Sequence, residues 1–332
     1  MVKSKDLLNG YQQHPPYMIE IEPVEGCNLG CSFCGLRGIR EKGNGKPWNL
    51  MTVEDAKMIA KKIKQAGWNS RICFCGHGEP TINPDLLEII KEFRKQLPKH
   101  KFQLISNGYG FKHGIFKIKD FLQSLEEIGF NDVVLDVYSD NGDWTTINDV
   151  CNKYDIKIIG RDGEKFNYDG KGMRVALYPL SVDEKVKILR IMDNHCGAAY
   201  PPDYSEKVVN KRCEKPFRYL FIRWNSLVCL CCDDFRGQYR IGNVADFEDI
   251  NDLWNSPAFQ AVRIMLYSDE HRKLPPCNGC NYHSIRPGLL PDPSGRDKNV
   301  MPQKLTKEVI SILKENYHKE GSTQIVKRKW EK

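Results

Sequence analysis

The stretch Glu25-Gly-Cys-Asn-Leu-Gly-Cys-Ser-Phe-Cys34 is the most informative in the chain, because it places Cys27, Cys31 and Cys34 in a C-x3-C-x2-C spacing. A four-iron cluster normally takes four thiolates. A compact set of three predicts either a fourth ligand elsewhere or an iron reserved for a small molecule. Composition alone gives only about 0.02 copies of this spacing in such a chain. Buried thiols or a zinc site are the alternative, but zinc ligands usually come as paired C-x2-C knuckles.

The composition indicates a folded protein with a sizeable core. With 332 residues and 40% hydrophobic content, the chain is long enough for one large α/β domain and a smaller appendage. It has no apolar run approaching the roughly 18 residues of a membrane span, and its first residues lack the apolar segment of a signal peptide. An odd number of clustered cysteines without an export signal favours metal ligation in a reducing compartment. We therefore predict a cytoplasmic protein with no membrane partner.

The formal net charge is +7, and part of it lies in the tail 327–332. A solvated terminus explains such a tail, and contact with an anionic nucleotide or nucleic acid is the alternative. No basic stripe interleaved with aromatic residues strengthens that alternative. Nucleic acid is therefore a disfavoured partner that the charge alone leaves open.

Short apolar runs alternate with helical patterns along the first 180 residues, which predicts a parallel sheet flanked by helices. The alternation fits a partial (β/α)6 barrel and a doubly wound sheet equally well. In both architectures ligands gather at the carboxyl ends of the strands. The strands are expected at 17–22, 71–75, 101–105, 132–138, 155–159 and 173–177. Helices are expected from Thr52 to Gly67, from an Asn83 cap with Pro84 at the first helical position, at 116–128 and at 304–317.

The exit of the second strand carries a distinctive turn, Gly76-His77-Gly78-Glu79-Pro80. A Gly-Glu-Pro sequence by itself is compatible with a plain turn. Its position after the second strand, in a chain that also carries the cysteine triple, favours a binding site instead. Cys73 and Cys75 lie within that strand and are expected to be core residues.

The cysteine triple, Phe33 just before its last cysteine, and Gly78-Glu79-Pro80 together resemble the radical S-adenosylmethionine superfamily. The resemblance implies the partial (β/α)6 TIM-like barrel and a catalytic [4Fe-4S] cluster held by Cys27, Cys31 and Cys34. It also implies S-adenosylmethionine bound to the open iron, with Gly78-Glu79-Pro80 holding the methionyl amino group. His77 departs from the family, which usually has glycine there. Weaker cofactor-binding candidates on the following strands are Asn107, Asp136 and Ser139.

A second set of cysteines occupies the C-terminal third, in Cys213, Cys229-Leu-Cys-Cys232 and Cys277-Asn-Gly-Cys280. This region resembles the SPASM/twitch extension, a β-hairpin followed by a helix that carries an auxiliary [4Fe-4S] cluster. The resemblance implies one auxiliary cluster, with Cys232 as the alternate for Cys231 and Cys229 as a weaker candidate. Ser226 stands where the hairpin usually has glycine. A zinc knuckle is the alternative. The implied ligands are Cys213, Cys231, Cys277 and Cys280.

Three residues are candidates for the chemistry on the substrate. The segment around His195 and Cys196 resembles a run in twitch-type dehydrogenases of aminocyclitols whose arginine lies at the substrate. His195 has the titration range of a general base. Cys196 is instead suited to donate a hydrogen atom, which would make the reaction a redox-neutral epimerisation. Asp233 follows the cysteine pair and is a candidate base or polar contact.

The resemblance predicts a radical S-adenosylmethionine core at 15–200, a SPASM/twitch domain at 205–283 and a tail at 284–332. Its implied activity is an oxidoreductase that abstracts hydrogen from an unactivated C–H bond of a small polar metabolite or a peptide residue. The auxiliary cluster would accept the electron, and an external one-electron reductant of the flavodoxin or ferredoxin type is the implied partner. The alternatives are an epimerase, an enzyme of peptide maturation or nucleotide modification, and a non-enzymatic electron carrier or zinc-binding adaptor.

Overall fold

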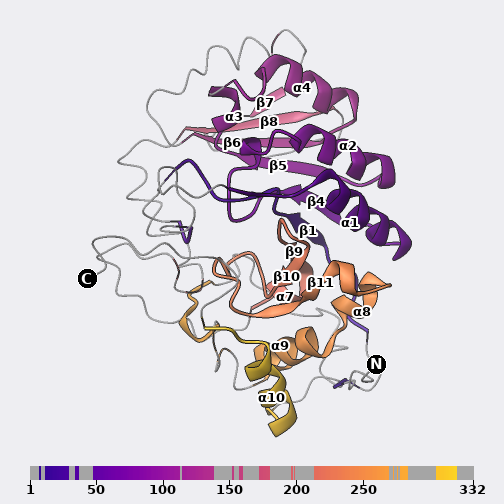
Figure 1. Cartoon of the computed structure of the whole chain (residues 1–332), viewed down its shortest axis with the longest axis vertical. Helices are drawn as coiled ribbons and strands as arrows, with labels where there is room; N and C mark the ends of the chain where they lie inside the picture. The colour runs from indigo at the N-terminus through magenta and orange to yellow at the C-terminus, as the bar shows by residue number, and fades with distance from the viewer. Residues whose placement is uncertain are drawn as a thin grey trace, which may run out of the picture.

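The computed structural model describes residues 7–8, 12–29, 34–36, 48–112, 114–137, 152, 157–159, 172–179, 196, 198, 213–268, 272, 275, 277–282 and 304–319. These residues form a mixed α/β structure around one nine-stranded sheet (Figure 1). Its strands are β1 (Met18–Ile21), β4 (Arg71–Phe74), β5 (Phe102–Ser106), β6 (Asp132–Val137), β7 (Lys157–Ile159), β8 (Arg174–Pro179), β9 (Tyr219–Ile222), β10 (Leu227–Cys229) and β11 (Arg240–Asn243).

The sheet runs in the order β11-β10-β9-β1-β4-β5-β6-β8-β7. The pairs from β9 through β1, β4, β5, β6 and β8 to β7 are all parallel. This confirms the parallel sheet of a partial barrel, and the described residues form no closed barrel. One departure from a sequential barrel lies at the edge, where β7 pairs outside β8. Strand β6 pairs with β5 on one edge and with β8, along all of 132–137, on the other. Strand β7 therefore pairs with the free edge of β8.

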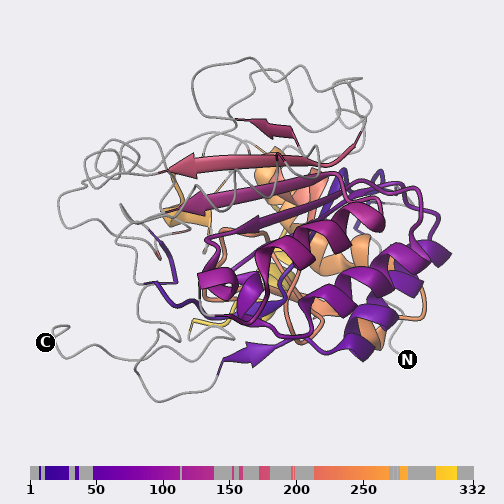
Figure 2. The same ribbon diagram turned by 90° about the horizontal axis from the view of Figure 1, so that it is seen from above.

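Helices α1 (Val53–Gln65), α2 (Leu86–Gln96) and α4 (Ile118–Glu127) cover one face of the parallel sheet (Figures 1 and 2). Each has apolar residues on one stripe, as the sequence predicts. Beneath them Phe74 lies at the centre of the core, with ring centroids 5.3 Å from Phe93 and 5.8 Å from Phe102. The predicted start of α1 is confirmed, because Thr52 Oγ1 accepts a hydrogen bond from the Asp55 amide.

The predicted start of α2 is wrong by two residues. Asp85 is its N-cap, and Asn83 lies before the helix. The Asn83 amide nitrogen instead donates to the carbonyl oxygens of Pro23 and Met51, at 3.1 and 3.0 Å. Its Oδ1 still accepts from the Asp85 amide at 2.9 Å, as a cap would, so the Asn83 side chain both stabilises the turn that enters the helix and joins it to the first loop of the chain.

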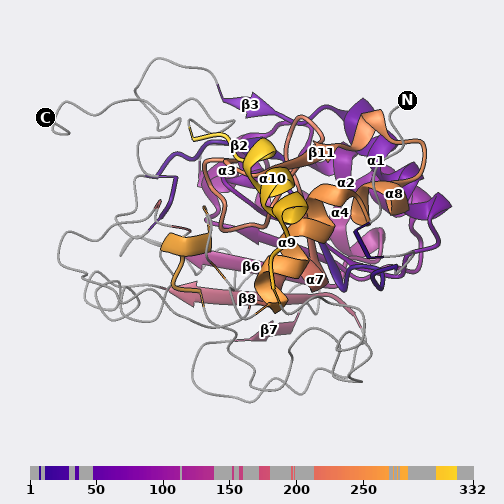
Figure 3. The same ribbon diagram turned by 90° about the horizontal axis from the view of Figure 1, so that it is seen from below.

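The C-terminal region adds an antiparallel hairpin to the same sheet. Strand β9 runs parallel to β1, and β10 pairs antiparallel with β9 and β11. Ser226 in the turn has φ of 63°, a left-handed conformation that explains why glycine suits this position. A hairpin followed by helices agrees with the sequence prediction. Figure 3 shows α9 and α10 packed together beside the β11 edge of the sheet. The helices are α7 (Lys215–Arg218), α8 (Ile250–Trp254), α9 (Pro257–Tyr267) and α10 (Lys307–Glu315).

The remaining elements are short and lie in the connections. A two-stranded sheet joins the segment after β1 to the segment before α1. Among the described residues, none of the helices has the length and apolar character needed to cross a membrane. The short elements are β2 (Val24–Glu25), β3 (Asn49–Leu50), α3 (Tyr109–Lys112) and the 3-10 turns Pro80–Ile82, Val244–Asp246 and Cys277–Gly279.

Candidate functional site

A cavity of about 170 Å³ lies at the carboxyl ends of β4, β5 and β6. Two of the three cysteines of the triple, Cys27 and Cys34, lie on its wall beside residues that follow the strands. Its lining is Cys27, Leu29, Cys34, Leu36, Cys75, Gly76, Gly78, Glu79, Ile105, Ser106, Asn107, Asp136 and Phe235. The candidates Gly78, Glu79, Asn107 and Asp136 therefore meet in one place. Cys31, Phe33 and Ser139 lie outside the described residues.

The sulfurs of Cys27 and Cys34 accept hydrogen bonds from N–H groups. Cys27 Sγ accepts from the Leu29 amide at 3.4 Å and from Asn107 Nδ2 at 3.5 Å. Cys34 Sγ accepts from the Leu36 amide at 3.4 Å. Such hydrogen bonds suit a thiolate and tune an iron–sulfur cluster bound to it. Asn107 also donates to Asn28 Oδ1 at 3.0 Å, so the end of β5 is fixed against the cysteine loop.

Gly78 brings the turn after β4 into main-chain contact with the cysteine loop. It forms a parallel bridge with Gly26, and the Glu79 amide donates to the Gly26 carbonyl at 3.0 Å. A Cβ atom at position 78 would lie 2.2 Å from the Val24 carbonyl oxygen. Only glycine fits here, because that oxygen belongs to backbone that has no room to move.

Glu79 joins the turn to the end of β5. Its side chain is buried and accepts hydrogen bonds from the Thr81 amide and hydroxyl, the Ser106 hydroxyl and the Asn107 amide, at 2.5 to 2.9 Å. Burial raises the pKa of Glu79, and the hydrogen bonds from Ser106, Thr81 and Asn107 oppose that rise. The carboxyl group thus organises the backbone around the cavity.

We expect Glu79→Ala to lower the free energy of unfolding of the apoprotein by about 2 to 4 kcal/mol, because it leaves buried donors without their acceptor. Glu88→Ala is the matched control. The Glu88 carboxylate makes an exposed pair with Lys91 at 2.7 Å, a contact worth about 0.5 kcal/mol or less. Urea denaturation of both variants measures the difference. Equal losses in the two variants would contradict the role assigned to Glu79.

The four auxiliary cysteines lie near one another in the C-terminal region. Cys213, Cys231, Cys277 and Cys280 are all buried. Burial, together with the neighbouring Cys231, raises the pKa of the Cys213 thiol to about 12. Burial likewise raises the pKa of Cys277, which interacts electrostatically with the other three cysteines. Cys280 Sγ accepts from the Tyr282 amide at 3.4 Å.

The described residues contain no group of three His, Cys, Asp or Glu side chains that could hold a metal ion. The four thiols nevertheless converge from positions far apart in the sequence. Burial raises the pKa of Cys213 and Cys277, so these two thiols would lose their protons only to a bound metal centre that stabilises the thiolates. In donor type and number, the four cysteines therefore fit a four-iron cluster.

The two adjacent cysteines of the hairpin face different surroundings. Cys231 belongs to the auxiliary set, whereas the Cys232 thiol hydrogen-bonds the Glu20 carboxyl group. Cys229 is buried beside Arg223, and burial raises the pKa of its thiol to about 12. These positions favour Cys231 as the ligand.

The candidates for substrate chemistry stay predictions. Cys196 has φ of 53°, and its thiol hydrogen-bonds Cys231 and Cys280, which raises its pKa. It therefore lies against the auxiliary set. The Asp233 carboxylate forms an ion pair with Lys215, whose ammonium group lies 3.8 Å from the centroid of the Tyr282 ring. His195 lies outside the described residues.

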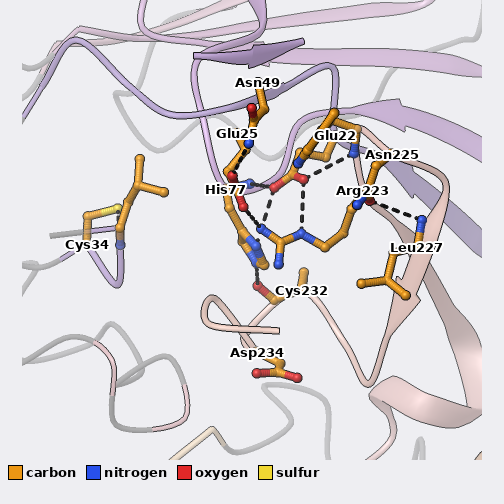
Figure 4. Close-up of polar contacts among 12 residues, drawn as sticks. Glu22, Glu25, Cys34, Asn49, His77, Arg223, Asn225, Leu227, Cys232 and Asp234 are labelled. Carbon is orange, nitrogen blue, oxygen red and sulfur yellow. Dashed lines mark hydrogen bonds and ion pairs between the residues drawn. The ribbon is translucent and has the colours of Figure 1, made fainter. Parts of the chain in front are cut away.

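Two features of the site were not predicted from the sequence. Cys75 is not a core residue like Cys73 but lines the cavity, because β4 ends at Phe74. The other part is a buried network in which Arg223 donates to Glu22 Oε2 at 3.2 Å and to Glu25 Oε1 at 2.5 Å (Figure 4). Acidic residues directly after the first strand were its sequence signal, but their partner lies about 200 residues away.

Two family models match the chain. Residues 21–159 match the radical SAM superfamily, and residues 213–281 match SPASM, an iron–sulfur cluster-binding domain. Together they span more than half of the chain, and they contain the cavity residues and all four auxiliary cysteines. The chain belongs to the radical SAM superfamily and carries a C-terminal SPASM domain. The wider domain boundaries expected from the sequence stay predictions.

Known proteins resemble parts of the chain. It is 28% identical over 110 residues to GTP 3',8-cyclase of Haemophilus ducreyi, covering 33% of this chain and 31% of the relative. It is 29% identical over 91 residues to a cysteine-type anaerobic sulfatase-maturating enzyme of Clostridium perfringens, covering 27% of this chain and 24% of the relative. The chain thus spans less than a third of either relative's length.

A solved structure resembles nearly the whole fold. BtrN in complex with AdoMet and 2-DOIA superposes with a TM-score of 0.61 at 20% identity, covering 82% of this chain and 96% of BtrN. At that identity the likeness concerns the fold. The family itself implies a [4Fe-4S] cluster with S-adenosylmethionine and an auxiliary iron–sulfur centre. The N–H groups aimed at Cys27 and Cys34 and the four converging buried thiols fit these cofactors.

Proposed function

We propose that this protein is an oxidoreductase that removes hydrogen from an unactivated C–H bond of a small polar metabolite, with the auxiliary cluster as the electron acceptor. The observation that supports this proposal most strongly is the placement of the Cys231–Cys232 segment. Its first thiol belongs to the auxiliary set, and the carbonyl of its second residue is 2.6 Å from His77 Nε2, in the turn that lines the cavity. This contact supports a direct structural link between the proposed electron acceptor and the proposed radical site.

The chain's own residues would prepare both ends of this reaction. When bound together, the cluster and S-adenosylmethionine supply a 5′-deoxyadenosyl radical that abstracts hydrogen. Cys27, Cys31 and Cys34 would hold the cluster, and Gly78, Glu79 and Pro80 would hold the methionyl group. The apolar side chains of Leu29, Leu36, Ile105 and Phe235 line the cavity and would keep water from the reactive species.

The auxiliary set supports electron transfer over substrate binding. Four thiolates complete the coordination of a four-iron cluster, so it would have no open iron for a substrate. Cys213, Cys231, Cys277 and Cys280 would be those ligands. An external one-electron reductant of the flavodoxin or ferredoxin type would renew the catalytic cluster. The hydrogen atom would go to the deoxyadenosyl radical, the proton to a base for which His195 is the candidate, and the electron to the auxiliary cluster. The substrate would thus lose two hydrogens, which is a net oxidation.

A product-mass experiment tests the proposal. The reconstituted protein is incubated anaerobically with S-adenosylmethionine, dithionite and aminocyclitols in deuterated water, with 2-DOIA tried first because it is named in the BtrN complex. We expect one product per 5′-deoxyadenosine, with two fewer hydrogens than the substrate. An isomer that has gained solvent deuterium would contradict oxidation and favour the redox-neutral alternative, in which Cys196 donates hydrogen.

A further inference from the structure

The His77 side chain connects the cavity turn to the auxiliary hairpin. Its imidazole is 1% exposed and lies between two aromatic rings, with centroids 4.5 Å from Phe221 and 4.1 Å from Phe235. Nε2 lies 2.6 Å from the Cys232 carbonyl oxygen (Figure 4). A carbonyl only accepts hydrogen bonds, so Nε2 carries the proton and donates. The imidazole therefore fixes the main chain directly after Cys231.

The His77 main chain belongs to the other site. Its carbonyl accepts from the Gly26 amide at 3.2 Å, and Gly26 directly precedes Cys27. Its amide donates to Glu22 Oε1 at 3.2 Å. The next residue is Gly78, whose tight contact with Val24 leaves the turn little freedom. The His77 ring is bonded to the hairpin at Cys232, and its main chain is bonded to the cysteine loop at Gly26. A displacement of the His77 side chain would therefore affect both the hairpin and the cysteine loop.

Buried ion pairs of Arg223 also hold the two regions together; they do not need the His77 ring, and they share with it only Glu22, whose Oε1 lies 3.4 Å from His77 Nδ1. Arg223 lies in the hairpin and is 1% exposed, and its ion pairs with Glu22 and Glu25 reach the loop after β1. The parallel pairing of β9 with β1 adds main-chain hydrogen bonds. Substitutions at position 77 should therefore leave the two regions assembled. The role of the His77 imidazole can therefore be tested in variants that keep the fold.

We propose that His77 is a positioning residue that couples the S-adenosylmethionine site to the auxiliary cluster site. Its ring fixes the Cys232 carbonyl, and through it the orientation of the Cys231 sulfur, while its main chain fixes the Gly26–Cys27 segment. The coupling applies whether the reaction is an oxidation or an isomerisation. It rests on Cys231 as an auxiliary ligand, which an iron count on the Cys231 and Cys232 variants tests separately.

The experiment compares reconstituted wild-type protein with His77→Ala, His77→Phe and His77→Gln. Phenylalanine keeps the aromatic stack but has no donor, and glutamine restores a donor. We expect His77→Ala to bind S-adenosylmethionine about 10-fold more weakly by equilibrium dialysis, the usual effect of losing an outer partner of a metal site. We also expect both Ala and Phe variants to shift the auxiliary midpoint potential in a titration followed by electron paramagnetic resonance. His77→Gln should restore the wild-type potential.

His100→Ala is the matched control. His100 Nε2 lies 2.7 Å from the Trp68 carbonyl, so this variant also removes a contact between a ring nitrogen and a backbone carbonyl, but at the amino end of the strands. It should leave both the affinity and the potential unchanged. Wild-type affinity in His77→Ala would overturn the coupling, as would a wild-type potential in His77→Phe. If His77→Ala loses its iron, the midpoint potentials of the other two variants test the coupling. A shifted potential in His77→Phe with a wild-type potential in His77→Gln would support it, and a wild-type potential in His77→Phe would overturn it.

Discussion

The Cys27→Ala protein is expected to form at least about 100-fold less 5′-deoxyadenosine than wild type when it is reduced with dithionite in the presence of S-adenosylmethionine. Removing an outer partner of a metal site already costs 10- to 100-fold, and Cys27 would be a direct ligand. Its sulfur lies in the cavity and accepts from Leu29 and Asn107, so alanine removes the acceptor at the centre of the site. Chromatography of the quenched reaction measures the nucleoside.

Cys73→Ala is the control for this prediction. Cys73 is also buried at the same sheet, but it is absent from the cavity wall. It should form 5′-deoxyadenosine at close to the wild-type rate once differences in iron content are taken into account. Undiminished production by the Cys27 variant would remove the central assignment of the catalytic cluster.

The second large effect is expected at the hairpin. Wild-type protein reconstituted under anaerobic conditions should hold about eight iron atoms and eight sulfides per chain, and Cys231→Ala should hold about four of each. The reason is that the Cys231 sulfur lies among Cys213, Cys277 and Cys280. Iron and sulfide analysis after desalting measures the change.

The neighbouring Cys232→Ala variant provides the comparison. Its thiol hydrogen-bonds Glu20, so its loss should leave the iron content at about eight per chain. The reverse pattern, with iron lost only from the Cys232 variant, would show that Cys232 is the ligand. About four iron atoms in the wild-type protein would remove the auxiliary cluster altogether.

Local patterns predicted the elements that position the site. The apolar runs gave the parallel strands to within one or two residues, because buried strands must be apolar wherever they lie in the chain. The turn at Gly78-Glu79-Pro80 was predictable for a different reason, since the carboxyl ends of parallel strands meet at one edge of a sheet. Its contact with Gly26 follows from that topology.

Other features depended on partners that local patterns do not reveal. The alternation of β4 placed Cys75 in the core, whereas the strand ends one residue earlier and Cys75 lines the cavity. The local bond of Asn83 to the start of the helix was predicted, and Oδ1 does accept from the Asp85 amide, but the bonds of Nδ2 to Pro23 and Met51 join segments that local patterns do not connect. Arg223 gave no local signal of its place between Glu22 and Glu25, because the pairing arises only when the hairpin folds against the first loop.

The parallel pairing of β9 with β1 has a consequence for the timing of the proposed reaction. Neighbouring strands stay about 4.8 Å apart, and their spacing is set by main-chain hydrogen bonds rather than by a linker. The auxiliary hairpin therefore shares a rigid framework with the loop that carries Cys27. Electron tunnelling slows steeply as separation grows, so a constant gap would let an electron leave the substrate without waiting for the SPASM domain to swing into place.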